Sequence, residues 1–132
     1  MASDSHAVPF SAARALRVAG LFAAAGLSLS VVKLATGLAI SCPWRSLTGT
    51  LCPLCGGTTM GTRLLVGDFA GAWASNPFAL VLLGLGGVAA IVWTVEVAGG
   101  PALRPPAALR SSALWWSLLG VTALAFMIVR NL

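Results

Sequence analysis

Three long apolar stretches dominate the chain, and a segment that carries all of its cysteines separates the first two. The stretches cover residues 18–40, 78–98 and 113–129. At about 1.5 Å per residue, a helix over either of the first two can cross a hydrocarbon core about 30 Å thick. The third is shorter, but Trp115 and Trp116 at its start are typical of a membrane interface. The pattern therefore predicts an all-α integral membrane protein with about three transmembrane helices.

Local signals mark both ends of the second stretch. Asn76 is a favoured N-cap residue, and Pro77 fits the first helical turn, where a missing backbone N–H costs little. Gly99, Gly100 and Pro101 end the helix on the other side. The second span is therefore the one whose limits the sequence defines best.

Composition excludes a water-soluble domain, because 58% of the residues are hydrophobic and only 8% are charged. The length predicts one membrane domain over residues 1–132, with a polar tail at residues 1–13. His6, the one histidine of the chain, lies in that tail. It is expected to be an ordinary solvated side chain.

Residues 41–77 form a Cys-rich, semi-embedded loop with short helices. Thr58 is expected to cap a first helix that ends near residue 66, and Asp68 a second that ends near residue 75. Neither helix is long enough to cross a bilayer. Both are expected to lie in the interface or to fold partly into the helix bundle.

The net charge of +5 comes from basic residues spread singly along the chain, without the clustered face of a nucleic-acid binder. With the N-terminus inside, the inner group is Arg14, Arg17, Arg104 and Arg110, and the outer group is Lys33, Arg45, Arg63 and Arg130. The close pair before the first span favours this orientation, because the first helix usually dominates. We expect a multi-pass protein of the cell membrane, partnered by the lipid bilayer and not by nucleic acid.

All three cysteines lie in one fourteen-residue segment, CPWRSLTGTLCPLC, which two glycines follow. The spaced elements are Cys42-Pro43, Thr48-Gly49, Cys52-Pro53, Cys55-Gly56-Gly57-Thr58, Gly67-Asp68 and Asn76-Pro77. In this order they resemble the core of DUF2752, a family of small bacterial membrane proteins. Many members have an arginine after the threonine of the CGGT run, where this chain has Thr59; we expect Arg63, one helical turn later, to reach a similar place. The resemblance implies the membrane architecture and a family of unassigned function.

Three roles remain open for Cys42, Cys52 and Cys55. They are structural thiols or a disulfide in a compact loop, a zinc site, or a redox pair. The two-residue separation of Cys52 and Cys55 lets both thiolates reach one metal ion, and Cys42 can supply a third ligand. Asp68, water or a partner would then supply the fourth. A C-x-x-C pair with an internal proline also fits thiol-disulfide exchange.

The sequence favours a small interaction or accessory protein whose CPLCGGT loop forms a rigid surface for another membrane protein or a second copy. The alternative is a membrane thiol-disulfide or metal-binding protein that uses Cys52 and Cys55. We predict no catalytic residues, because the one His lies in the polar tail and not near the cysteines. The only acidic residues are Asp4, Asp68 and Glu96.

Overall fold

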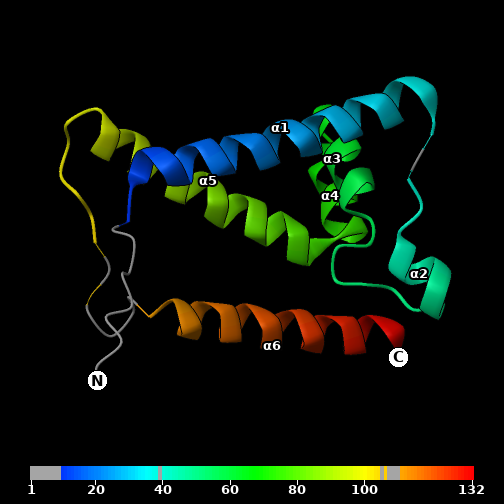
Figure 1. Ribbon diagram of the computed structural model, residues 1–132. Helices are drawn as coiled ribbons and strands as arrows, with labels where there is room; N and C mark the ends of the chain where they lie inside the picture. The colour runs from blue at the N-terminus through cyan, green and yellow to red at the C-terminus, as the bar shows by residue number, and fades with distance from the viewer. Residues whose placement is uncertain (1–9, 39, 105, 107–110) are drawn as a thin grey trace.

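A computed structural model describes residues 10–38, 40–104, 106 and 111–132 of the chain (Figure 1). In chain order its helices are α1 (Ala12–Thr36), α2 (Pro43–Thr48), α3 (Gly57–Leu65), α4 (Phe69–Ser75), α5 (Pro77–Val97) and α6 (Ser112–Asn131). These residues contain no strand, so the expected all-α class is confirmed. The helices α1, α5 and α6 are each long and apolar enough to cross a membrane, which makes this a multi-pass membrane protein. Asp4, His6 and Arg110 lie outside the described residues.

Successive spans run in opposite directions, and α1 packs against α5 (Figure 1). The short helices α3 and α4 pack on each other and lie where α1 nears its end and α5 begins. The C-terminal end of α6 reaches the same end of the bundle. We call residues 42–76, which contain α2, α3 and α4, the head. It gathers most of the short-range polar contacts on one side of the molecule.

Caps, and not hydrophobicity, determine where the spans begin. α1 begins at Ala12, before the apolar stretch, because the Ser11 hydroxyl accepts a hydrogen bond from the Arg14 backbone N–H. In the same way Ser111 accepts from Leu114 at the start of α6, which is 20 residues long. Each helix therefore extends beyond the part that hydropathy alone identifies.

The start of α5 behaves as its sequence predicts. The Asn76 side-chain oxygen accepts from the Ala79 backbone N–H at 2.9 Å, and Pro77 occupies the first turn. Asp68 likewise caps α4 by accepting from the Gly71 N–H at 2.8 Å. Asparagine and aspartate are effective here because a short side chain brings an oxygen to the free N–H groups of the first turn.

The expected cap at Thr58 is wrong. Helix α3 begins at Gly57, so Thr58 lies inside its first turn, and no side chain caps this end. Gly56 takes the cap position with φ = +90°, a left-handed conformation that a residue with a Cβ rarely adopts. The tight turn after Cys55 therefore requires a glycine at the position that a capping side chain would otherwise fill.

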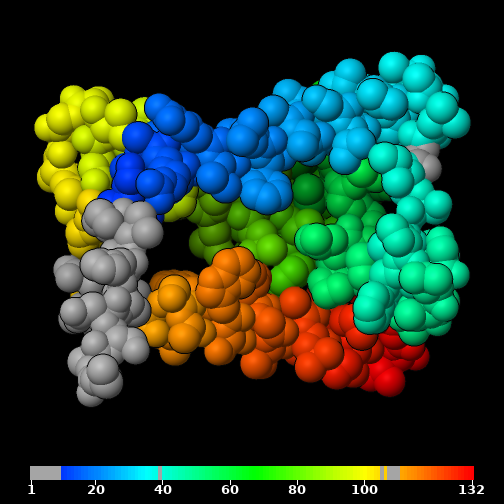
Figure 2. Space-filling view, in the orientation of Figure 1, coloured from blue at the N-terminus to red at the C-terminus, as the bar shows by residue number. Residues whose placement is uncertain are grey.

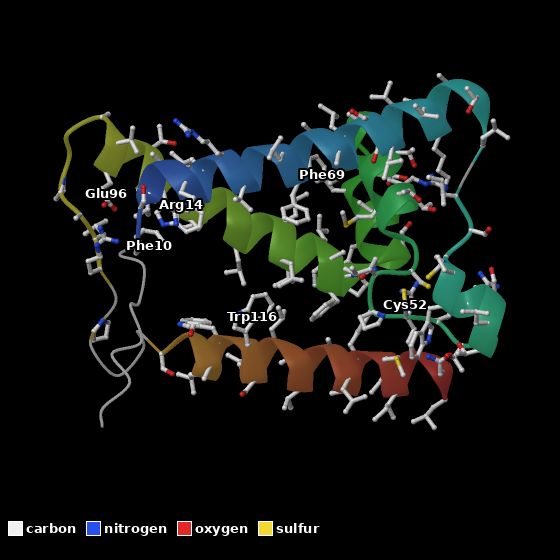
Figure 3. All side chains as sticks on the ribbon, in the orientation of Figure 1. Phe10, Arg14, Cys52, Phe69, Glu96 and Trp116 are labelled. Atoms are coloured by element: carbon white, nitrogen blue, oxygen red, sulfur yellow. The ribbon has the colours of Figure 1, made fainter. Side chains whose placement is uncertain are left out.

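The end opposite the head is closed by an ion pair. Arg104 donates to Glu96 at 2.5 Å and lies over the Phe10 ring, 4.8 Å from its centroid. Phe10 in turn meets Trp93, with ring centroids 5.9 Å apart. Figure 3 shows Phe10 and Glu96 near this end, far from Cys52 at the head. Glu96 is thus engaged by a neighbouring arginine, which satisfies its charge at the edge of a span.

Packing is dense only around the head. The buried residues among those described are Ala12, Ser30, Cys55, Met60, Ala72 and Asn76. All but Ala12 belong to the head or touch it. The spans instead leave large apolar side chains exposed along their length. In Figure 2 a gap is visible between α6 and the other two spans. Such surface is stable in contact with lipid, not water.

An apolar groove of about 470 Å³ separates α5 from α6. Its walls include Phe78, Leu82, Trp115, Leu119 and Phe126. At one place the two helices meet directly, where the rings of Phe78 and Phe126 stack with centroids 5.4 Å apart. The third span is therefore joined to the others mainly by this stack and by polar contacts at the head.

The close approach of α1 to α3 gives a test of the packing. A Cβ on Gly61 of α3 would lie 2.1 Å from the Ser30 hydroxyl and 3.1 Å from its Cβ on α1. We expect Gly61→Ala to lower the free energy of unfolding by about 1–3 kcal/mol, as overpacking typically does. Thermal unfolding in mild detergent measures the change.

The matched control is Gly20→Ala, because nothing lies within 4 Å of a Cβ at Gly20. Adding Ser30→Gly to Gly61→Ala should restore stability, since it removes both atoms that the new methyl group meets. Gly20→Ala should leave stability unchanged or raise it, because alanine has the higher helix propensity. A loss of the same size at Gly20 would show that the approach of α1 to α3 is not the cause.

Candidate functional site

The three cysteine sulfurs lie together at the head. Cys42 stands at the N-cap of α2, while Cys52 and Cys55 flank the turn that leads into α3. The Sγ atoms of Cys42 and Cys52 are 3.4 Å apart, and those of Cys52 and Cys55 are 3.0 Å apart. All three lie within 4.8 Å of one another. The structure thus brings together the three site residues that the sequence singles out, with Cys52 in the middle.

The surroundings of the thiols shift the pKa values of Cys42 and Cys52 in opposite directions. Backbone N–H donation from Arg45, aided by the thiols of Cys52 and Cys55, lowers the pKa of Cys42 to about 7. Burial, followed by the hydrogen bonds to Cys55 and Cys42, raises the pKa of Cys52 to about 11. At neutral pH the thiolate is therefore favoured at Cys42, outside the C-x-x-C pair.

Asn76 holds the turn that carries Cys52 and Cys55. Its side chain is fully buried, and its amide nitrogen donates to the carbonyl oxygens of Pro53 and Cys55 at 2.9 and 3.1 Å. The oxygen of the same amide caps α5. One side chain thus satisfies three backbone groups that a bilayer interior cannot hydrate.

The last turn of α6 reaches the same turn from the other side. Arg130 donates to the carbonyl oxygen of Cys55 at 2.7 Å and to that of Ser75 at 2.8 Å. Asn131 pairs with Leu51 through both backbone groups, accepting from its N–H at 2.8 Å and donating to its oxygen at 2.9 Å. We call Asn76, Arg130 and Asn131 the clamp. It ties the cysteine turn to the start of one span and the end of another.

The two glycines after Cys55 have different roles. A Cβ on Gly56 would lie 2.8 Å from the Ser75 carbonyl oxygen and 3.5 Å from the Arg130 guanidinium. No atom lies within 4 Å of a Cβ on Gly57. Gly56 therefore permits the backbone of the turn to approach the end of α4, where Arg130 bridges Cys55 and Ser75.

Comparison with known proteins bears on this segment. Residues 42–90 match one family model. The family is DUF2752, described as a protein of unknown function. The resemblance carried by the spaced cysteine, glycine and Asn-Pro elements is therefore confirmed. No curated protein and no solved structure matches the chain.

The DUF2752 match covers the whole head and runs into α5, but it does not include the two residues of α6 that complete the clamp. Arg130 lies 75 and 55 positions away from Cys55 and Ser75, and Asn131 lies 80 positions away from Leu51. In the sequence Arg130 is only one more membrane-flanking cation. No local signal identifies its role, because the contact depends on the return of α6 to the head.

The departure from the DUF2752 pattern at Thr59 also has a structural counterpart. The Lys33 ammonium group, near the end of α1, donates to the Thr59 hydroxyl, so a cation reaches this position from another helix. Arg63 is engaged elsewhere, in an ion pair with Asp68 at 2.9 Å. The expectation that Arg63 reaches a place similar to that of the missing arginine stays a prediction. Asp68, already used by Arg63 and by the cap of α4, is also no ligand beside the cysteines.

Helix α2 was not expected. Its N-cap residue, Cys42, carries the thiol whose pKa is lowered. Its punctuation is nevertheless present in the sequence, since Pro43 occupies the first position and Gly49 follows the last with φ = +71°. Because Cys42 stands at its N-terminus, the free N–H groups of the first turn point toward the sulfur. A proline and a glycine six residues apart were the available signal.

The buried amide of Asn76 can be tested with one substitution. In Asn76→Asp the oxygen that caps α5 remains, but a carboxylate oxygen replaces the donor that faces two carbonyl groups. We expect the free energy of unfolding to fall by about 2–4 kcal/mol, because two buried acceptors lose their donor. Ser111→Ala, which removes only the cap of α6, should cost about 1 kcal/mol. An Asn76→Asp variant that unfolds like the natural chain would show that Asn76 acts as a cap alone.

The division of acidities predicts an order of thiol alkylation. In the reduced, metal-free protein, iodoacetamide should label Cys42 first at pH 7, because the thiolate is the reactive form. Its rate should rise with pH around a midpoint of about 7, whereas Cys52 should stay slow until the pH approaches about 11. Mass spectrometry of the digested protein gives both rates. Faster labelling of Cys52 than of Cys42 at pH 7 would contradict the assignment.

Proposed function

We propose that this chain is a small accessory or interaction protein of the cell membrane, folded as one membrane domain, with the CPLCGGT loop as a rigid surface for a partner. The clamp is the observation that carries the proposal. Asn76, Arg130 and Asn131 together satisfy backbone groups of Leu51, Pro53 and Cys55. A loop held from two separate spans keeps one shape, and a fixed shape lowers the entropy lost when a partner binds.

The surface of the head supports a contact with another protein. Leu47 is 86% exposed and Leu54 is 62% exposed. Trp44, which precedes Leu47 by three residues, is also exposed. Trp44 is fixed in place, since its indole N–H donates to the Thr50 hydroxyl at 3.0 Å. Rigid aromatic side chains next to exposed leucines are typical of the centre of an interface. The two arginines before the first span, Arg14 and Arg17, favour a cytoplasmic N-terminus, and this orientation puts the surface of the head outside the cell.

The groove between α5 and α6 supports association within the bilayer. It is apolar, and it opens between two spans whose Phe78 and Phe126 rings stack at one end. Another transmembrane helix, from a second copy or another membrane protein, would add the packing that α6 lacks. Close packing of side chains is the main source of such association in lipid.

A second candidate function follows from the sulfur geometry. Three Sγ atoms within 4.8 Å of one another fit a metal-binding or thiol-disulfide protein, with Cys42, Cys52 and Cys55 as the ligands or exchanging thiols. The raised pKa of Cys52 disfavours it as the attacking thiol, and Cys42 is the better nucleophile. For metal binding, zinc is the familiar ion, with a fourth ligand from water or a partner.

Two substitutions distinguish the functions. Cys52→Ser places a smaller, more polar group between two sulfurs, so under the interaction function it should lower the free energy of unfolding by about 1–2 kcal/mol. Less protein should then accumulate in the membrane, and cross-linked complexes should diminish. Leu47→Ser should leave thermal unfolding unchanged, because this side chain is exposed, and yet reduce cross-linking to the partner.

The opposite pattern supports the second function. If Cys52→Ser accumulates and unfolds like the natural chain, the loop does not depend on its thiols for its shape. If Leu47→Ser also leaves the cross-linked complexes unchanged, the exposed face of the head is not a partner surface. Chemistry at the sulfurs is then the function that the head provides.

A further inference from the structure

The spacing of the sulfurs suits one metal ion with three thiolate ligands. At a metal–sulfur distance of about 2.3 Å, a trigonal site places its sulfurs about 4.0 Å apart. The Sγ atoms of Cys42, Cys52 and Cys55 lie 3.0 and 3.4 Å apart along the chain of contacts and all within 4.8 Å. Small rotations about the Cα–Cβ bonds therefore convert the cluster into a trigonal site without a change in the backbone.

The donor set contains sulfur alone. Among the described residues, the group that can share one ion consists of the three cysteines and includes no His, Asp or Glu. Asp68, the acidic residue of the head, accepts from Arg63 and from the Gly71 N–H. Structural zinc sites are almost always four-coordinate, whereas a softer ion of lower charge, such as copper(I), prefers thiolates and needs fewer of them.

The surroundings compensate the negative charge of such a centre. A monovalent ion with three thiolates carries a net charge of −2, which is costly near a bilayer. The guanidinium of Arg130 binds the Cys55 carbonyl at 2.7 Å, which places a fixed positive charge beside the cluster. Such outer contacts orient the ligands of a metal and tune its affinity.

We propose that Cys42, Cys52 and Cys55 bind one soft monovalent ion of the copper(I) class in a three-coordinate thiolate site, with Arg130 as the charge-compensating neighbour. The inference rests on the metal-binding candidate function and deepens it by naming the ion and its coordination. Binding releases the thiol protons to the medium and changes no oxidation state. The ion then joins α2 to the turn before α3, two parts of the head that the clamp does not connect.

The test uses the full chain, reduced and kept without oxygen in mild detergent. Copper(I) is titrated against a chromogenic copper(I) chelator, and zinc is titrated separately. We expect one copper per chain, three sulfur neighbours by X-ray absorption, and at least about a 100-fold loss of affinity in each single Cys→Ser variant, since each removes a direct ligand. Thermal unfolding of the same samples identifies any variant that has lost its fold, and copper should raise the unfolding temperature of the natural chain.

Arg130 provides a second readout. Arg130→Gln removes the charge and should weaken copper binding by about 10–100-fold with the stoichiometry unchanged, whereas Arg130→Lys should largely restore it. Arg63→Gln is the matched control, because Arg63 is exposed and binds Asp68 instead. Equal losses at Arg63 and Arg130 would overturn the role of Arg130.

Two results would overturn the site itself. Stoichiometric zinc with an oxygen neighbour, and copper that the chelator removes completely, would refute the copper(I) class while leaving a metal site in place. Failure of the folded, reduced chain to bind either ion would refute metal binding altogether. Neither result bears on the interaction function, because that function is tested by the cross-linking of the Leu47→Ser variant.

Discussion

A single buried side-chain amide, that of Asn76, is the interaction on which the arrangement of the head depends. It connects the first turn of α5 to the backbone of Pro53 and Cys55, and it is the largest side chain that is fully buried among the described residues. A neutral side-chain amide carries two N–H donors on one atom and an acceptor oxygen on another, so one asparagine can serve two carbonyl groups and one backbone N–H. The shorter asparagine also fits the N-cap geometry. Its position before Pro77 therefore joins the limit of a span to the shape of the cysteine turn.

The location of this interaction follows from the solvent of the protein. Burial of apolar surface contributes little to the association of helices in lipid, so specific order depends on close contacts and hydrogen bonds. Here both are concentrated at the head, where Gly61 meets Ser30, Lys33 meets Thr59, and Arg130 closes the turn from α6. The spans beyond the head present mainly apolar surface. The molecule thus resembles a small ordered head on three helices that lipid surrounds.

The clamp and the cysteine cluster are parts of one arrangement, which is why a structural and a chemical function both fit. The same carbonyl of Cys55 accepts from Asn76 and from Arg130, so whatever fixes the turn also fixes one of the three sulfurs. Cys42 is different, because it belongs to α2 and meets the other two through sulfur contacts. A partner that covers the head and an ion that joins its sulfurs would stabilise the same conformation. In the interaction function the thiols stabilise the loop that a partner binds. In the second function the loop holds the thiols in position for metal binding or exchange.

The sequence by itself determined the class of the protein, the number of its spans and the caps at Asp68 and Asn76, because hydropathy and capping depend on residues within a few positions of one another. It also identified the cysteine segment and its likeness to DUF2752. It missed α2, whose proline and glycine are brief signals inside a short loop. Only the tertiary structure decided that Cys42 joins Cys52 and Cys55, that Lys33 faces Thr59, and that Arg130 and Asn131 close the head. The contacts of Arg130 and Asn131 join residues that are distant in sequence, and they exist because antiparallel spans return α6 to the end of the bundle where α1 finishes. The sulfur contacts are local in sequence, but they depend on the path that the chain takes through α2.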